Sequence, residues 1–322
     1  MSQIIYNGGA PKAEISDVFS STMEELFHLD SKVVYIDADL MGSMKTKALW
    51  KKYPDNVVNT GIQEANMIGV AAGLYLTGMK PYVHSFSPFA SRRVFDQVFL
   101  SIGYAGKSIR IIGSDAGIMA TYNGGTHMSF EDVGVLRSIP EIVIVEPTDC
   151  IQLKKLLPQI VDHYGVVYIR TLRKEATDVF SENDNFDLFK STKLQDGKDV
   201  SIFCSGMMVQ ETLMANKTLK EHGINADIIN IYTTKPIDKD AIIKSAKKTG
   251  AVVTAENHNL IGGLRSAVTE VLSENYPVYV KSVGVNDKFG QVGKIPYLKE
   301  QYNMRAEDII EKVKEVLALK RA

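Results

Sequence analysis

Cysteine is scarce in this sequence of 322 residues, which has only two, Cys150 and Cys204. They lie far apart, so they form neither the close pairs of a zinc site nor the framework of a disulfide-rich secreted domain. The first residues, 1–6, also lack the basic start and the apolar core of a signal peptide. We therefore expect a reducing compartment and a cytoplasmic location.

An excess of either charge is also absent. Lys and Arg number 37 and Asp and Glu 38, which gives a formal net charge of −1 at pH 7. Without a strong positive field, nucleic acid and anionic membranes are poor partners. The longest apolar run, residues 68–76, is too short for a bilayer, which needs about 20 residues. We expect no nucleic-acid partner and no membrane partner.

Four well-known catalytic signatures are missing as well. The sequence has no Walker A phosphate loop, no Gly-x-Gly-x-x-Gly after a strand, no His-Glu-x-x-His and no Gly-x-Ser-x-Gly. Kinase, nucleotide-dependent dehydrogenase, zinc protease and α/β-hydrolase functions therefore lack their usual sequence support.

The sequence does contain a regular alternation of β-branched runs and amphipathic stretches. Strands are expected at residues 32–37, 82–86, 109–112, 142–145, 166–169, 200–204, 226–231, 251–254 and 278–283. Helices are expected at residues 16–29, 63–76, 91–103, 148–164, 205–221, 238–248, 262–274 and 306–319. Near-continuous apolar strands between helices indicate mostly parallel sheets covered on both faces.

A polar stretch, residues 171–199, separates the two halves of this alternation. The sequence therefore predicts an α/β fold of two doubly wound domains, residues 1–185 and residues 186–322.

Glu64 stands at the head of an unusually apolar helix. Burial there would favour the protonated carboxyl, the form that a general acid needs. A carboxylate is also favoured at a helix N-terminus by the helix dipole, without any catalytic role. The residues alone leave both interpretations open.

Two further segments follow strands of the first half. Phe86 and Phe89 lie at a strand-to-helix loop, the ligand-binding edge of an open parallel sheet, where their rings could stack on a heteroaromatic ligand or pack in the core. His127 follows Gly124 and Gly125, which allow a close approach of the backbone. Each signal is weak alone. The segment 256–263 resembles a loop that enters a helix, with a structural or interfacial role.

The order of the segments is more specific than any one of them. Taken in sequence, residues 36–40, 61–64, 86–89, 124–127 and 168–170 closely resemble the pyrimidine-binding domain of transketolase, and residues 254–258 and 288–293 resemble its C-terminal domain. The resemblance covers essentially the whole chain. It is similar to the C-terminal half of a transketolase, of the kind that some organisms encode as a separate subunit.

The resemblance implies an enzyme that uses thiamine diphosphate to transfer a two-carbon ketol unit from a ketose to an aldose. Glu64 falls at the position of the carboxyl that shares a proton with ring nitrogen N1′ of the cofactor. Phe86 and Phe89 match the aromatic positions that flank the aminopyrimidine, and Asp39 and Leu40 match residues near the thiazolium side.

The resemblance also implies a substrate site. His127 matches a histidine that faces the substrate, so Glu64 and His127 are the expected catalytic residues. Ser43 and Arg170 match phosphate contacts, and Arg92 stands where the family more often has Tyr or Gly.

Three positions depart from the family pattern. Counting back from His127, Asn123 stands where transketolase has an aspartate that reads a sugar hydroxyl, and Asp115 stands where it usually has a histidine that binds the sugar phosphate. Ser16 stands in place of an arginine, with Lys12 a possible substitute. A carboxylate repels a dianionic phosphate. We therefore expect a sugar substrate whose distal end is not an ordinary phosphate.

No Gly-Asp-Gly occurs in the chain. Transketolases use this motif, with a later asparagine, to hold the metal that binds the cofactor diphosphate. The resemblance therefore implies that Mg²⁺ (or Ca²⁺) is held by a partner, an N-terminal transketolase subunit, and that this chain supplies no metal ligand. The expected assembly is an α2β2 heterotetramer in which this chain also pairs with itself.

Other functions remain open. One is the β-subunit of a 2-oxoacid dehydrogenase or ferredoxin oxidoreductase, and another is half of a deoxyxylulose-phosphate synthase. A third is a regulatory or scaffolding subunit without catalysis. The Asp-Ala-Asp-Leu, Gly-Gly-Thr-His and Phe-Gly-Gln-x-Gly segments favour transketolase, and the presence of Glu64, both phenylalanines and His127 argues against lost catalysis.

Overall fold

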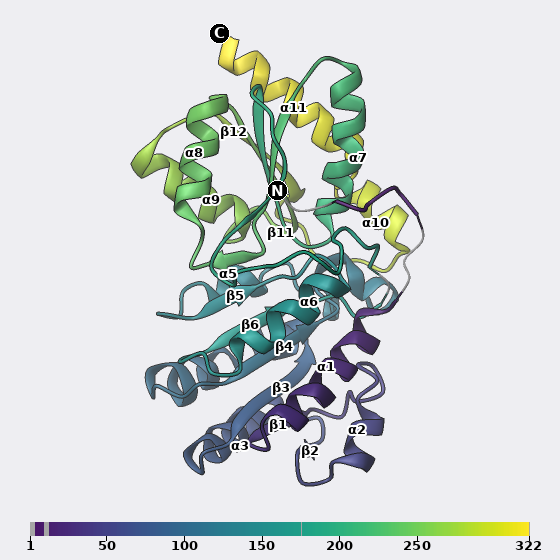
Figure 1. The fold of residues 1–322 in the computed structure, drawn as a ribbon, viewed down its shortest axis with the longest axis vertical. Coiled ribbons are helices and arrows are strands. Elements are labelled where there is room, and N and C mark those ends of the chain that lie inside the picture. The colour runs from purple at the N-terminus through teal and green to yellow at the C-terminus, as the bar shows by residue number, and fades with distance from the viewer. Residues whose placement is uncertain (1–3, 10–12, 175, 322) are drawn as a thin grey trace.

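The protein consists of two α/β units stacked end to end (Figure 1). Each unit is one sheet with the helices that cover it, and the two are called the first and the second layer below. The computed structural model describes residues 4–9, 13–174 and 176–321. The first half of the chain forms the lower part in Figure 1 and the second half the upper part, which confirms the predicted two-sheet α/β fold.

The first sheet has seven strands in the order β10-β5-β6-β4-β3-β1-β2. All its neighbours are parallel except β10, which pairs antiparallel with β5. The strands are β1 (Val33–Asp37), β2 (Val57–Asn59), β3 (Lys80–Phe86), β4 (Arg110–Ser114), β5 (Val143–Val145), β6 (Val167–Arg170) and β10 (Thr233–Lys235).

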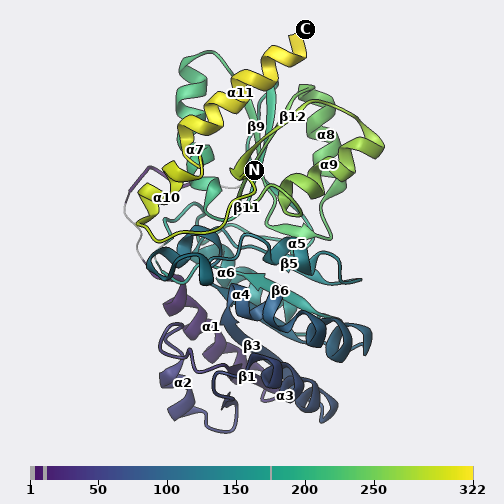
Figure 2. The same cartoon turned by 180° about the vertical axis from the view of Figure 1, so that it is seen from behind.

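Helices cover both faces of this sheet (Figures 1 and 2). On one face α1 packs beside α6, and on the other α3 packs beside η2, each over its own apolar cluster. The helical segments are α1 (Ile15–Leu29), α2 (Lys47–Lys52), α3 (Glu64–Leu76), α4 (Ser87–Ala90), η1 (Arg92–Val94), η2 (Gln97–Tyr104), η3 (Gly117–Thr126), α5 (Asp132–Leu136), α6 (Cys150–Leu156) and η4 (Leu157–Ile160). None of the described helices is long and apolar enough to cross a membrane.

The second sheet has five strands in the order β12-β11-β8-β9-β7, parallel except for β7 against β9. The strands are β7 (Thr192–Gln195), β8 (Val200–Cys204), β9 (Ala226–Asn230), β11 (Val252–Asn259) and β12 (Val280–Val285). The helices are α7 (Met208–Glu221), α8 (Lys239–Thr249), α9 (Leu264–Asn275), α10 (Ile295–Gln301) and α11 (Ala306–Arg321). Helices α7 and α11 cover one face, and α8 and α9 the other (Figure 1).

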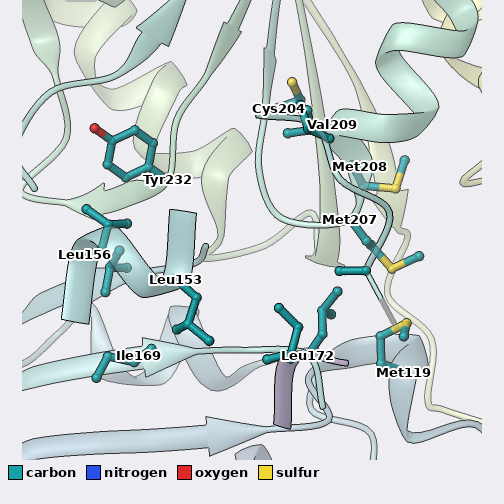
Figure 3. Packing of buried hydrophobic residues seen from close by; sticks show 14 of the residues in the cluster. Met119, Leu153, Leu156, Ile169, Leu172, Cys204, Met207, Met208, Val209 and Tyr232 are labelled. Atoms are coloured by element: carbon teal, nitrogen blue, oxygen red, sulfur yellow. The ribbon is translucent and has the colours of Figure 1, made fainter. Parts of the chain in front are cut away.

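The two layers share one hydrophobic core. Figure 3 shows Leu153 and Ile169 of the first layer in the same cluster as Met207 and Tyr232 of the second. Strand β10 also crosses the division, because it follows three strands of the second sheet in the chain and yet completes the edge of the first.

Some segments differ from the sequence predictions. The helix expected at 91–103 is a short 3₁₀ turn followed by a π-helix, and the helix expected at 148–164 is shorter and ends in a 3₁₀ turn. Strand β11 continues to Asn259, so the segment expected as a loop at 256–259 lies at a strand end. Its Asn257 donates to the carbonyl of Ala116 and accepts from the backbone of Ile118, which confirms an interfacial role.

Candidate functional site

The expected site residues come from neighbouring loops at the carboxyl edge of the first sheet. Asp39 and Leu40 follow β1, Phe86 ends β3, and Asp115 follows β4. Glu64 begins α3, after β2. Because β1, β3 and β4 are adjacent in the sheet, their ends meet at one place, which is where open α/β sheets bind ligands.

Glu64 is both buried and at a helix N-terminus, so the features behind both sequence interpretations are present. Its side chain is 3% exposed. Ser85 Oγ donates to Oε1 at 3.0 Å, and Arg93 Nη1 donates to Oε2 at 2.9 Å. Arg93 was not predicted to belong to the site, because nothing in the sequence distinguishes it from Arg92. The carboxyl is thus held by two donors from the β3 side of the site.

Phe86 and Phe89 form an aromatic wall with His127. The two phenylalanine centroids are 6.4 Å apart, and the imidazole of His127 packs edge-on at 5.9 Å from Phe86 and 5.1 Å from Phe89. The guanidinium carbon of Arg93 lies 3.8 Å from the Phe89 ring centroid, a cation–π contact. The structure therefore brings together three residues predicted from the sequence, and Arg93 joins them to Glu64.

A hollow of about 590 Å³ opens over this wall, lined by Phe89, Arg92, Arg93, Thr126 and His127. A flat heteroaromatic ring with a basic nitrogen needs an aromatic wall and a carboxyl group nearby, and the Phe pair with Glu64 provides both. The residues present therefore fit the aminopyrimidine end of thiamine diphosphate. In the described part of the chain, no three His, Cys, Asp or Glu side chains are grouped so that they could hold a metal ion.

The turn after β1 is held by Asn59. Asp39 has a positive φ of 64°. Its backbone N–H donates to Asn59 Oδ1 at 3.1 Å, and Asn59 Nδ2 donates back to its carboxylate at 3.0 Å. The same Asn59 oxygen accepts from Gly61 at 3.0 Å, so one amide links the Asp39 turn to the segment before Glu64. Ser43 lies in the following turn, where its N–H donates to the carbonyl of Leu40.

Asp115, the first residue after β4, has an unusual environment. Its φ is 56° and it is buried, and neither carboxylate oxygen has an aligned hydrogen bond. Arg173 Nε lies 2.7 Å from Oδ2, and the Arg173 guanidinium carbon is 5.8 Å from the Phe86 centroid. Burial raises the pKa of Asp115, while the charge of Arg173 opposes the rise. This pair has no net charge when both groups are ionised.

Arg170 does not line the site, which corrects the prediction that it contacts a substrate phosphate. Its guanidinium is fully buried beneath the second layer. Nε donates to Asp132 at 2.9 Å, Nη1 donates to Glu146 and Nη2 donates to the carbonyl of Asn257 at 2.7 Å. All of these partners belong to the protein interior. The strand-end position favours Arg173 as the arginine that faces the site, a distinction that the motif match alone did not make.

Of the remaining predicted residues, Arg92 and Asn123 are exposed and Ser16 is buried. Arg92 forms an ion pair with Glu131 at 2.5 Å and donates to the carbonyl of Thr126. The side chain of Asn123 is exposed. Ser16 is buried and its N–H donates to the backbone carbonyl of Arg173 at 2.9 Å, so it contacts the backbone of the residue that pairs with Asp115. Lys12 lies outside the described residues.

The His127 loop approaches the second layer closely. A Cβ at Gly125 would lie 2.5 Å from the carbonyl oxygen of Gly290, and Gly124 has a φ of 68°. The glycines expected to allow a close backbone approach therefore do so against residues 290–292. The second layer in this way fixes the position of His127.

Comparisons with known families match both halves. Residues 11–178 match the family described as "Transketolase, pyrimidine binding domain", and residues 190–309 match "Transketolase, C-terminal domain".

Individual proteins are similar over nearly the full chain. The 6-deoxy-6-sulfo-D-fructose transketolase subunit of Clostridium sp. is 48% identical over 94% of each chain. An apulose-4-phosphate transketolase subunit of Phocaeicola vulgatus is 36% identical over 84% of this chain and 86% of that one. A solved structure described as "Split gene transketolase, inactive beta4 tetramer" superposes with a TM-score of 0.88 at 38% identity and covers 97% of this chain and 100% of that one.

Proposed function

Because the chain belongs to the transketolase family, we propose that it is the C-terminal subunit of a split, cytoplasmic transketolase that transfers a two-carbon ketol unit from a ketose to an aldose. Residues 1–185 would be its pyrimidine-binding domain and residues 186–322 its C-terminal domain. The observation that carries the proposal is the buried carboxyl of Glu64 beside an aromatic wall that His127 completes.

Thiamine diphosphate, when bound, supplies a carbon nucleophile that can accept the ketol unit. In this proposal Phe86 and Phe89 would hold the aminopyrimidine of the cofactor, and Glu64 would share a proton with its N1′. His127, at the mouth of the hollow, binds the sugar hydroxyls and moves a proton to or from them. Asp39 and Leu40 form the wall on the thiazolium side.

Glu64→Gln tests the proton-sharing role. Glutamine keeps the shape and can still accept the bond from Ser85, but its amide cannot release and regain a proton, so we expect turnover to fall by at least about 100-fold. Glu211→Gln is the matched control, because Glu211 is also buried and ion-paired, with Lys299 at 2.5 Å, but lies in the second layer. Near-wild-type turnover of Glu64→Gln, with partner and saturating cofactor, would show that Glu64 is not the proton relay.

The proposed partner is an N-terminal transketolase subunit that carries the Mg²⁺ (or Ca²⁺) and diphosphate site, in an α2β2 assembly. The lack of a Gly-Asp-Gly motif and the similarity to a split-gene transketolase tetramer support this proposal. Calorimetry with thiamine diphosphate and Mg²⁺ tests it. We expect binding by the two-subunit complex and none at micromolar cofactor by the chain alone, whose tight binding would contradict a shared site.

For the substrate, we propose a ketose whose distal end carries at most one negative charge. A phosphate monoester is close to a dianion at pH 7, since its second pKa is about 6. Asp115 cancels the charge of Arg173, so a dianion there would lack a net counter-charge, whereas a sulfonate carries only one charge. The similar subunit that is named for 6-deoxy-6-sulfo-D-fructose supports such a donor.

A matched pair of donors tests this choice. 6-Deoxy-6-sulfo-D-fructose and fructose 6-phosphate differ only at the distal end, and we expect the sulfonate to have the higher kcat/KM with the reconstituted complex. Asp115→His should raise kcat/KM for the phosphate. If both donors and xylulose 5-phosphate react above about 10⁴ M⁻¹s⁻¹, and Asp115→His brings no gain, the enzyme is an ordinary transketolase.

A further inference from the structure

A fully buried chain of hydrogen bonds runs beneath the site across three strands. Tyr35 and Asp37 lie on β1, His84 on β3 and Ser114 on β4, and all four side chains are completely buried. Tyr35 donates its hydroxyl to Asp37 Oδ2 at 2.7 Å. His84 Nδ1 lies 2.8 Å from the same oxygen, and His84 Nε2 lies 2.9 Å from Ser114 Oγ.

The chemistry of the groups sets the direction of these bonds. An ionised carboxylate only accepts, so Nδ1 of His84 carries the hydrogen and donates to Asp37. The Nε2 of a neutral imidazole then accepts from the hydroxyl of Ser114. The other oxygen of Asp37 accepts from the backbone N–H of Leu40. Three donors therefore converge on one carboxylate.

The order carboxylate, imidazole and hydroxyl is that of a hydrolase triad, but the arrangement does not make Ser114 a nucleophile. Ser114 is completely buried, so no substrate carbonyl can approach its Oγ. The two ends of this hydrogen-bond chain connect it to the site. One end holds the backbone of Leu40, and the other is the residue directly before Asp115.

We propose that His84 is a positioning residue that ties the cofactor-side turn at Asp39 and Leu40 to the sugar-side carboxylate of Asp115. His84 is directly opposite Asp37 in the β1–β3 register, and β4 is the next strand on its other side. An imidazole has a nitrogen on each side of its ring, so it can bridge both neighbouring strands at once. The terms cofactor side and sugar side rest on the proposed function.

The hydrogen-bond chain can be tested in the protein alone, without cofactor. In a long-range ¹H–¹⁵N spectrum of the imidazoles, we expect the His84 signals, assigned by their loss in His84→Phe, to show the Nδ1–H tautomer. Ser114→Ala should shift the His84 Nε2 resonance. The Nε2–H tautomer, or no response to Ser114→Ala, would overturn the proposed chain.

The positioning role is tested with the two-subunit complex by cutting each link in turn. Ser114→Ala frees only the sugar side, so KM for the ketose should rise about three- to tenfold, the effect of one lost hydrogen bond, with kcat nearly unchanged. Tyr35→Phe should instead raise the apparent Kd for thiamine diphosphate with Mg²⁺. His84→Phe should raise both constants.

Ser201→Ala is the matched control, because its hydroxyl is equally buried and bonds Ser245 and Thr249 in the second layer. It should change neither constant. The proposal is overturned if His84→Phe leaves both the KM for the ketose and the Kd for thiamine diphosphate at wild-type values. It is also overturned if Ser114→Ala and Tyr35→Phe each change the KM and the Kd by the same factor. Absence of ketose turnover by the wild-type complex would instead refute the proposed function, while the spectra and the cofactor Kd would still decide the role of His84.

Discussion

Arg170 and Arg173 stand three positions apart and have different environments. Arg170 is still on β6, and its guanidinium lies in the interior between Asp132 and Glu146. Arg173 lies beyond the strand, partly exposed, beside Asp115 and Phe86. The family motif indicates Arg170 because a sequence pattern alone does not show where the strand ends. The position of the end of β6 therefore decides which of the two arginines can contact a ligand.

Arg170→Met should lower the free energy of unfolding by about 3–5 kcal/mol, because Asp132 and Glu146 would remain buried without their cation. Arg173→Met should cost less than Arg170→Met, because it leaves one buried carboxyl, that of Asp115, without its cation instead of two, and because Arg173 is itself partly exposed. Urea unfolding of both variants measures the difference. Arg173→Met should also raise KM for an anionic ketose. A stable Arg170→Met protein with a raised KM would restore Arg170 to the substrate site.

At the scale of elements, the loop 123–127 depends on the segment 290–292. The loop that places His127 on the aromatic wall passes so close to Gly290 that a Cβ at Gly125 would lie 2.5 Å from the Gly290 carbonyl oxygen. A side chain at Gly125 would meet a backbone carbonyl, which cannot rotate away. The loop would then have to move, and the imidazole with it.

Gly125→Ala should therefore reduce turnover by at least about tenfold, given the sensitivity of catalysis to small misplacements. It should also destabilise the chain. Gly73→Ala is the control, because it lies within α3 and its Cβ would meet no atom within 4 Å. That change should leave the chain equally stable or slightly more stable. Thermal unfolding and steady-state rates measure both; wild-type behaviour of Gly125→Ala would mean that the loop adapts without cost.

Strand β11 supplies the N-terminal cap of α9 from a distance. The carboxyl of Glu256 accepts from the N–H groups of Leu264 at 2.6 Å and Arg265 at 2.8 Å. Burial nevertheless raises the pKa of Glu256 to about 8. An unfolded glutamate has a pKa near 4.3. At pH values between about 4.3 and 8, the folded protein therefore keeps a proton on Glu256 that the unfolded chain has released.

The sign of the pH dependence follows from this difference. The stability linked to Glu256 is complete below pH 4.3 and is lost as the pH rises through 8. Burial lowers the pKa of His258 to about 4, whereas an unfolded histidine has a pKa near 6.5. The change of stability with pH that His258 causes is therefore confined to pH values below about 6.5. Between pH 6.5 and 8 the wild type should therefore lose between about 1 and 2 kcal/mol that Glu256→Gln does not lose. Urea midpoints measure this slope, with the exposed Glu274→Gln as control; equal slopes for wild type and Glu256→Gln would contradict the assignment.

Sequence periodicity predicted the long apolar strands and most of the helices, because each buries a continuous face. It did not predict β2, β7 or β10. Each has only three or four residues, and β10 reads Thr-Thr-Lys, so its strand conformation comes from pairing with β5 and not from its own composition. Glu64, Phe86, Phe89 and His127 were found through the order of motifs. Arg93 and the Asp37–His84–Ser114 chain required three-dimensional neighbours that no spacing shows.

At the scale of the whole molecule, the two layers are joined by an apolar core and by buried polar bonds. The cluster in Figure 3 contains residues from both sheets, and Arg170 donates to the backbone of Asn257 across the interface. Separating the layers would expose this core and leave Arg170 with fewer partners. The two layers should therefore lose their structure together.

A single unfolding transition is the expected result. The one tryptophan, Trp50, lies on α2 and reports on the first layer, whereas far-ultraviolet circular dichroism reports on both. The two signals should change at the same urea concentration, with one calorimetric peak. Two separated transitions would show that the layers are independent.

Because β10 is made late, the first sheet cannot be completed until most of the second sheet has been synthesised. The ribosome makes β5 early, but the strand that covers its edge is made only after β7, β8 and β9 of the other sheet. Until residue 235 has emerged, the nascent first sheet has an open edge, and such an edge is a template for pairing with other chains. A polypeptide that stops at residue 178, where the first family match ends, would never acquire that cover.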